Sequence, residues 1–177
     1  MRLNKLFAII LFSVGVGFAP ASANALELNL TPNHVLSIWT NINDALVAVG
    51  GSIAATPPSA RDLQNANRMS AVVFADKTPG DVLGQLTVIR ARLDAIAVAR
   101  NLDISRVYVD PDGAAVTPSV VFLNSGHVLD TLVRILNDAD PDLLAGGFYA
   151  KTAYEDKTPS DVFGLIDLVS RRLDLLL

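Results

Sequence analysis

The chain of 177 residues contains no cysteine, only two histidines and only two glutamates. Without cysteine it can form neither a disulfide nor a thiolate metal site. Nearly all its acids are aspartates, the exceptions being Glu27 and Glu155. Aspartate favours helix caps and turns over helix interiors. We therefore expect many of the carboxylates to lie at helix ends and in loops.

Acidic residues outnumber basic residues, so the formal net charge is −4. No basic stripe is present to neutralise phosphates, which argues against nucleic acid or anionic lipid as a partner.

The N-terminus carries the pattern of a cleaved signal peptide over residues 1–25. Arg2 and Lys5 precede an apolar run from Leu6 to Phe18, which is short for a membrane span. Small residues suit cleavage after Ala23 or Ala25, and no cysteine follows to carry a lipid anchor. We expect Sec export to the periplasm or beyond. Cleavage would change the formal charge from −4 to −6.

Residues 26–177 are long enough for one domain with a real core. No second apolar stretch is long enough to suggest a membrane span after cleavage. Since no disulfide is available in an oxidising compartment, the core alone must hold the fold.

A Thr-Pro-x-x-Val pattern occurs four times, beginning at Thr31, Thr78, Thr117 and Thr158. Threonine is a good N-cap, and proline at the first helical position lacks an N–H that would be unpaired anyway. In two copies an aspartate, Asp81 or Asp161, occupies the third helical position, where it can bond back to the cap. The pattern therefore predicts four helix starts.

Each copy continues with apolar residues at offsets +4, +8, +11, +15 and +18 from its threonine, the seam of an amphipathic helix. Only Ser125 breaks the series. The seam residues are Val35, Trp39, Ile42, Leu46 and Val49; Val82, Leu86, Ile89, Leu93 and Ile96; Val121, Ser125, Val128, Leu132 and Ile135; and Val162, Ile166, Val169, Leu173 and Leu176.

The seams predict helices over 32–49, 79–99, 118–137 and 159–177. The third contains Ser125-Gly126, so its start near Ser125 is an alternative. The fold class is all-α, a four-helix bundle with an up-down arrangement as the default. The long connections should carry short elements, a helix within 57–70 opened by Thr56-Pro57 and an extended piece over 106–113.

The second and fourth copies match beyond the cap (DKTPGDVLGQLTVIRARLDAI and DKTPSDVFGLIDLVSRRLDLL), and the first and third share His-Val-Leu. This similarity indicates a duplicated two-helix unit, with repeat units of about 31–101 and 117–177.

No catalytic constellation and no cofactor motif emerges. His34 and His127 lack zinc-ligand spacing, and NSGH (124–127) does not form a nucleophile elbow. Asp138, Asp140 and Asp142 alternate like the start of a calcium loop. The glycine and the bidentate glutamate of an EF-hand are absent, so a looser site drawing on Asp110 and Asp112 is the alternative to a solvated turn.

Four residues stand out as candidate ligand or partner contacts. Arg92 and Arg172 occupy equivalent repeat positions; they either pair with nearby acids or clamp an anionic ligand between two helices. Trp39, the only tryptophan, is either a core residue or the wall of a pocket. Phe163 lies beside the seam and widens its apolar stripe.

The sequence favours an exported, non-enzymatic protein that acts by binding a protein partner or itself. The alternative is a periplasmic small-molecule binding or sensor domain with a pocket between helices near Trp39, Arg92 and Arg172. An enzyme using aspartate pairs has no supporting spacing.

Overall fold

The protein is all-helical in a computed structural model that describes residues 28–54, 56–104, 109, 111, 115–144 and 152–177. The predicted signal peptide and most of the predicted extended piece lie outside these residues. The helices are α1 (Pro32–Val49), α2 (Ala60–Arg68), α3 (Pro79–Ala99), α4 (Pro118–Ala139) and α5 (Pro159–Leu176), with 3-10 turns η2 (Gly50–Ser52) and η3 (Pro141–Leu144). No strand occurs in the described part of the chain.

The four predicted long helices are confirmed, each beginning at the proline of its Thr-Pro pair. The alternative start near Ser125 is wrong, because Thr117 caps α4 by accepting a hydrogen bond from the Val120 N–H. The predicted short helix is confirmed as α2. Its cap is Ser59, which accepts from the Asp62 N–H, instead of Thr56-Pro57.

Reciprocal capping fixes the starts of α3 and α5. Asp81 accepts hydrogen bonds from the hydroxyl and the N–H of Thr78, and these bonds hold the pKa of Asp81 below its ordinary value. Asp161 does the same for Thr158, and its pKa is lowered in the same way. In α1 the third helical residue is His34, whose Nδ1 accepts from the Thr31 N–H.

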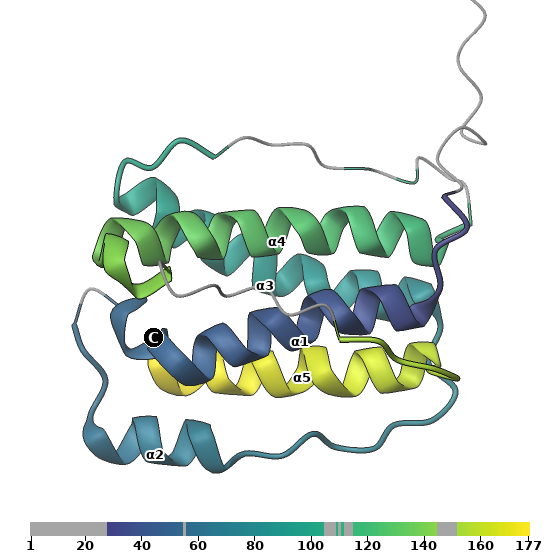
Figure 1. The fold of residues 1–177 in the computed structure, drawn as a ribbon, viewed down its shortest axis with the longest axis horizontal. Helices are drawn as coiled ribbons and strands as arrows, with labels where there is room; N and C mark the ends of the chain where they lie inside the picture. Colours follow the sequence, from purple (N-terminus) through teal and green to yellow (C-terminus); the bar gives the residue numbers. More distant parts are fainter. Residues whose placement is uncertain (1–27, 55, 105–108, 110, 112–114, 145–151) are drawn as a thin grey trace, which may run out of the picture.

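All four long helices run in the same direction, so the expected up-down arrangement is wrong. Their first turns meet at one end, around a hollow lined by the four prolines and the four first seam valines (Pro32, Val35, Pro79, Val82, Pro118, Val121, Pro159 and Val162). Figure 1 shows residues 56–78, which carry α2, returning along the outside of the long helices from the other end to the start of α3. A helix of this length spans about 30 Å, which about ten extended residues can retrace. The connections of 18 or more residues between the helices are long enough for this return.

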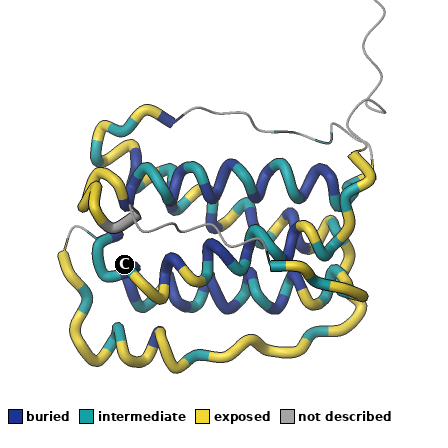
Figure 2. Tube along the Cα trace, viewed as in Figure 1, coloured by how far each residue is buried: buried dark blue, intermediate teal, exposed yellow. Residues whose placement is uncertain are grey.

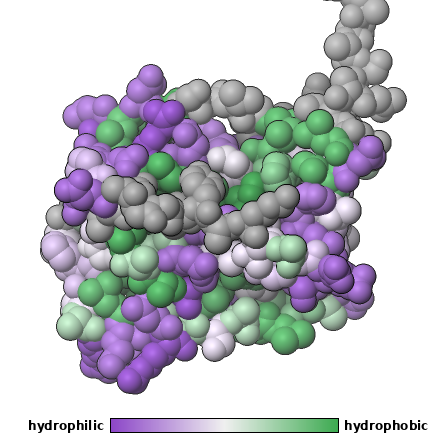
Figure 3. All heavy atoms as spheres, viewed as in Figure 1, coloured by the Kyte–Doolittle hydropathy of each residue, from purple (hydrophilic) through white to green (hydrophobic). Residues whose placement is uncertain are grey.

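The helices form a ring in the order α1, α4, α3, α5. α4 and α5 each pack on both α1 and α3, whereas α1 and α3 lie diagonally opposite. Figure 2 shows buried positions along all four, while α2, which packs on α5, is mostly exposed. The surface near α2 is hydrophilic (Figure 3).

Parallel helices in register place equal offsets of the four seams at the same level. The only polar seam residue, Ser125, lies at the same offset as Trp39, and the indole N–H donates to its hydroxyl at 2.8 Å. The hydroxyl in turn donates to the Val121 carbonyl at 2.8 Å. Both side chains are fully buried. The small serine therefore makes room for the indole and satisfies its N–H.

By length and composition, α4 could cross a membrane, but 67% of its most apolar stretch is buried inside the protein. This burial is the pattern of a core helix.

The connecting segments lie on the outer faces of three helices. The segment before α3 covers α5, where Phe74 stacks edge-to-face on Phe163 with ring centroids 4.9 Å apart. The segment before α5 reaches α1, where the Tyr154 and Thr40 hydroxyls are 2.7 Å apart. On α4, the Asn124 amide donates to the Val109 carbonyl at 3.0 Å.

A repeated hydrogen bond links neighbouring helix starts around the ring. The residue before a capping threonine donates its N–H to the second helical residue of the next helix. Leu30 donates to Ser119 at 3.4 Å, Lys77 to Ser160 at 3.0 Å and Lys157 to Asn33 at 2.9 Å. The fourth junction would join Val116 to Gly80, which has no side chain to accept this bond.

Gly80→Ser is expected to stabilise the protein by about 1–2 kcal/mol, from a new hydrogen bond to the Val116 N–H and a lower backbone entropy of the unfolded chain. The added Cβ would meet nothing closer than the Thr78 hydroxyl at 3.5 Å. Urea denaturation measures the gain. Gly80→Ala is the control, because it changes the backbone entropy but supplies no acceptor. Equal stability of the two variants would show that no bond forms at this junction.

Candidate binding surface

The outer side of α3 carries an exposed, uncharged stripe. Gly84, Val88, Ala91, Ala95 and Val98 follow the 4-3-4-3 spacing of a helix face, and all five are exposed. We call these five residues the α3 outer face. Val88 and Val98 are 49% and 56% exposed. No charged residue among the described positions of α3 beyond Asp81 is exposed to this degree. An apolar stripe this long on a helix surface marks a candidate interaction site.

On α5, the positions equivalent to the α3 outer face are covered by the segment that precedes α3. Gly164 corresponds to Gly84, and a Cβ on Gly164 would lie 2.6 Å from the Val72 carbonyl of the covering segment. Arg171 corresponds to Ala91 and donates to the Ser70 carbonyl of that segment at 3.1 Å. At Gly84 an added Cβ would meet none of the described residues within 4 Å. In the part of the chain that the structure describes, no segment covers Gly84, and α3 has alanine where α5 has Arg171.

Arg92 borders the α3 outer face and pairs with Asp174 of α5 at 2.6 Å. Its side chain is 38% exposed and that of Asp174 is 53% exposed. The pair therefore lies at the surface, where such contacts are weak.

Arg172, the repeat equivalent of Arg92, is buried and has a different role. It donates to the carbonyls of Ala66 and Met69 at 3.0 and 3.1 Å and also to the Asn43 side chain. These carbonyls belong to the end of α2, so Arg172 fastens α2 to α5. Burial lowers the pKa of Arg172 from its ordinary value. The two arginines share no partner among these contacts.

Phe163 is half-buried beneath Phe74, and the Lys77 ammonium lies 4.5 Å from its ring centroid. The chain therefore covers the apolar stripe at Phe163 with its own residues. Trp39 lies in the core with its N–H satisfied by Ser125. The structure does not bring Trp39, Arg92, Arg172 and Phe163 into one site.

The alternating aspartates have separate contacts. Asp138 pairs with Arg100 at 3.7 Å, and Asp140 accepts from the Asp142 N–H at 3.0 Å. The described residues contain no group of three or more His, Cys, Asp or Glu placed to hold a metal ion. The further candidates Asp110 and Asp112 lie outside the described residues.

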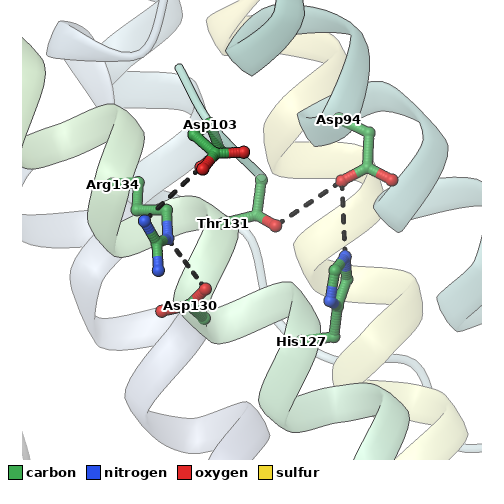
Figure 4. Close-up of polar contacts among 6 residues, drawn as sticks. All are labelled: Asp94, Asp103, His127, Asp130, Thr131 and Arg134. Carbon is green, nitrogen blue, oxygen red and sulfur yellow. Dashed lines mark hydrogen bonds and ion pairs between the residues drawn. The ribbon is translucent and has the colours of Figure 1, made fainter. Parts of the chain in front are cut away.

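A polar cluster lies between α3 and α4 (Figure 4). The Asp94 carboxylate accepts from Thr131 at 3.5 Å and faces His127 Nε2 at 3.6 Å. His127 is only 8% exposed. The Thr131 hydroxyl contacts the carboxylate and not the imidazole, so the cluster lacks the nucleophile–base–acid order of a hydrolase triad. The arrangement pairs buried polar groups across two helices.

The hollow at the helix starts is a cavity of only about 10 Å³, open to solvent on one side, and its described lining is entirely proline and valine. Ligand pockets for drug-sized molecules usually exceed about 300 Å³ and carry a few orienting polar groups. This hollow offers neither.

No protein-family model, curated protein or solved structure matches the chain. Sequence reasoning missed the α3 outer face, although its signal was present. Residues 84, 88, 91, 95 and 98 repeat the seam spacing on the side of the helix opposite the seam.

Proposed function

We propose that the protein is an exported, non-enzymatic binding protein that acts through the α3 outer face. We further propose that it is a four-helix bundle derived from a duplicated two-helix unit, with export directed by residues 1–25. The Gly84–Gly164 and Arg92–Arg172 correspondences support the duplication. The observation that carries the function is the contrast between the exposed, uncharged face of α3 and the covered face of α5.

The small-molecule alternative has less support. Trp39 is fully buried, and its N–H is hydrogen-bonded to Ser125. The Arg172 guanidinium donates its hydrogen bonds to carbonyls of the same chain. The hollow at the helix starts is small and has no polar lining. A bound ligand would therefore need space that the described residues do not enclose.

Site-specific photo-cross-linking in an exporting host tests the proposed function. A photoreactive residue at Ala91 is expected to give a protein adduct, because Ala91 lies at the centre of the α3 outer face. The same residue at Ala48, an exposed position of α1, is the matched control. An adduct at Ala91 and none at Ala48 supports the proposal. Equal labelling at both positions, or none at Ala91, overturns it.

A further inference from the structure

We propose that residues 69–76 form an inhibitory binding loop for a secreted serine protease, and that Val73 enters the specificity pocket of that protease. The pocket would be one that takes small aliphatic side chains. This inference goes beyond the proposed function, because it uses the segment that covers α5 and not the α3 outer face.

The segment presents one side chain far out into solvent. Val73 is 95% exposed, more than any other exposed large hydrophobic residue in the described part of the chain. Residues 69–75 contain no helix, turn or bend, so their backbone is extended. Figure 2 shows the path between α2 and α3 as mostly exposed. Protease clefts bind an extended backbone through its free main-chain groups and take one side chain into a pocket.

The part of the loop before Val73 is held by two arginines of α5. Arg172 donates to the Met69 carbonyl at 3.1 Å, and Arg171 donates to the Ser70 carbonyl at 3.1 Å. In the described residues no main-chain hydrogen bond holds residues 70–76, so these side-chain donors fix the backbone. A loop held in its binding conformation loses little entropy when a partner binds it.

The part after Val73 is held independently. Phe74 stacks on Phe163 with ring centroids 4.9 Å apart, and the Lys77 N–H donates to Ser160 at 3.0 Å. Asp76 has a φ of 57°, which ends the extended stretch. Both sides of the Val73–Phe74 bond are therefore attached to α5 through separate contacts.

These separate attachments favour an inhibitor over a substrate. The protease serine would attack the Val73 carbonyl carbon and break the Val73–Phe74 bond, leaving Val73 as an ester and Phe74 with a free amine. Because Phe74 stays packed on Phe163, its amine remains beside the ester and attacks it in preference to water. The peptide bond then re-forms and the serine regains its proton.

The length and charge of the loop select this class of partner. Only residues 71–73 lie between the two attached parts, which is short for addition to a sheet edge, where strands average about 5–6 residues. Residues 69–75 carry no charge. An uncharged segment with a protruding valine fits a small apolar pocket and not an acidic one.

Pancreatic elastase, whose pocket takes small side chains, is the probe. We expect the exported protein to block hydrolysis of a small chromogenic peptide by elastase at close to equimolar amounts. Mass spectrometry should find the chain intact or cut at Val73–Phe74 alone. Rapid digestion without inhibition would make the loop a substrate, and full elastase activity in a large excess of the protein would show that no complex forms. Either result overturns the inference.

Exchange of Val73 tests the pocket residue. Val73→Asp should weaken elastase inhibition by about 100-fold or more, because it places a charge in an apolar pocket. Val73→Arg should lose elastase inhibition and gain inhibition of trypsin, whose pocket binds basic side chains. Val98→Arg is the matched control, since Val98 is also more than half exposed but lies within α3. Circular dichroism verifies the fold of each variant. Trypsin inhibition by both arginine variants, or by neither, overturns the assignment of Val73.

Phe163→Ala separates an inhibitor from a slow substrate. The variant removes the ring that holds Phe74, so the amine formed by cleavage can leave. Elastase should still bind the loop at first, but cleavage at Val73–Phe74 should run to completion and protease activity should return. Phe122→Ala, which removes a half-buried phenylalanine of α4, is the control and should remain an inhibitor. Lasting inhibition by Phe163→Ala would overturn the proposed mechanism.

Discussion

Trp39→Ala is expected to lower the free energy of unfolding by about 3–5 kcal/mol, because it leaves a cavity in a packed layer. Trp39 is fully buried, and its loss also removes the hydrogen-bond partner of Ser125. Domains of this size are stable by only about 5–15 kcal/mol, so the variant should unfold at a much lower urea concentration. Urea denaturation followed by circular dichroism measures the change.

A double-mutant cycle tests whether Trp39 and Ser125 share one layer. Trp39→Leu should destabilise by leaving space, and Ser125→Leu should destabilise by about 1–3 kcal/mol by overfilling the same layer. Combined, leucine at both positions should restore the layer volume. The double variant should therefore lose at least about 1 kcal/mol less than the sum of the single losses. Simple additivity would show that the two side chains do not compete for one space.

Arg172→Ala is expected to cost about 2–4 kcal/mol, whereas Arg92→Ala should cost less than about 1 kcal/mol. Removing Arg172 leaves the carbonyls of Ala66 and Met69 without the hydrogen-bond donor that they have in a buried site. Removing Arg92 breaks only a surface ion pair with Asp174. The two arginines occupy equivalent repeat positions, so each variant is the matched control of the other.

Limited trypsin digestion supplies a local measurement of the Arg172 effect. Without Arg172 the end of α2 should loosen, and cleavage after Arg68 should accelerate more than cleavage elsewhere in the chain. The Arg172→Met variant keeps most of the side-chain volume and so separates lost hydrogen bonds from lost packing. Equal losses for Arg92→Ala and Arg172→Ala would contradict the different roles assigned to them.

The sequence by itself determined where the long helices begin and which residues they bury. Thr-Pro pairs fix a helix start through local hydrogen bonds and a fixed φ, and these depend on neighbouring residues only. The seam spacing likewise identifies the buried side of each helix, since helix periodicity is local. Val35, Val82, Val121 and Val162 were predicted as the first buried turn and are all buried.

The direction of the helices was decided only by the tertiary structure. Long connections permit both parallel and antiparallel neighbours, and the energy difference between them comes from packing between residues far apart in sequence. For the same reason Ser125 was only an irregularity in the sequence. Its role became visible once parallel helices placed it at the level of Trp39, which is 86 positions away along the chain.

The candidate binding surface also depended on tertiary contacts. Gly84 and Gly164 occupy matching sequence positions, yet Gly164 is covered and Gly84 is open. The difference arises because the segment that ends at α3 crosses α5 on its return, where Arg171 and Phe163 hold it. Local sequence specifies each helix face, but only the path of the chain between helices decides which face stays exposed to a partner.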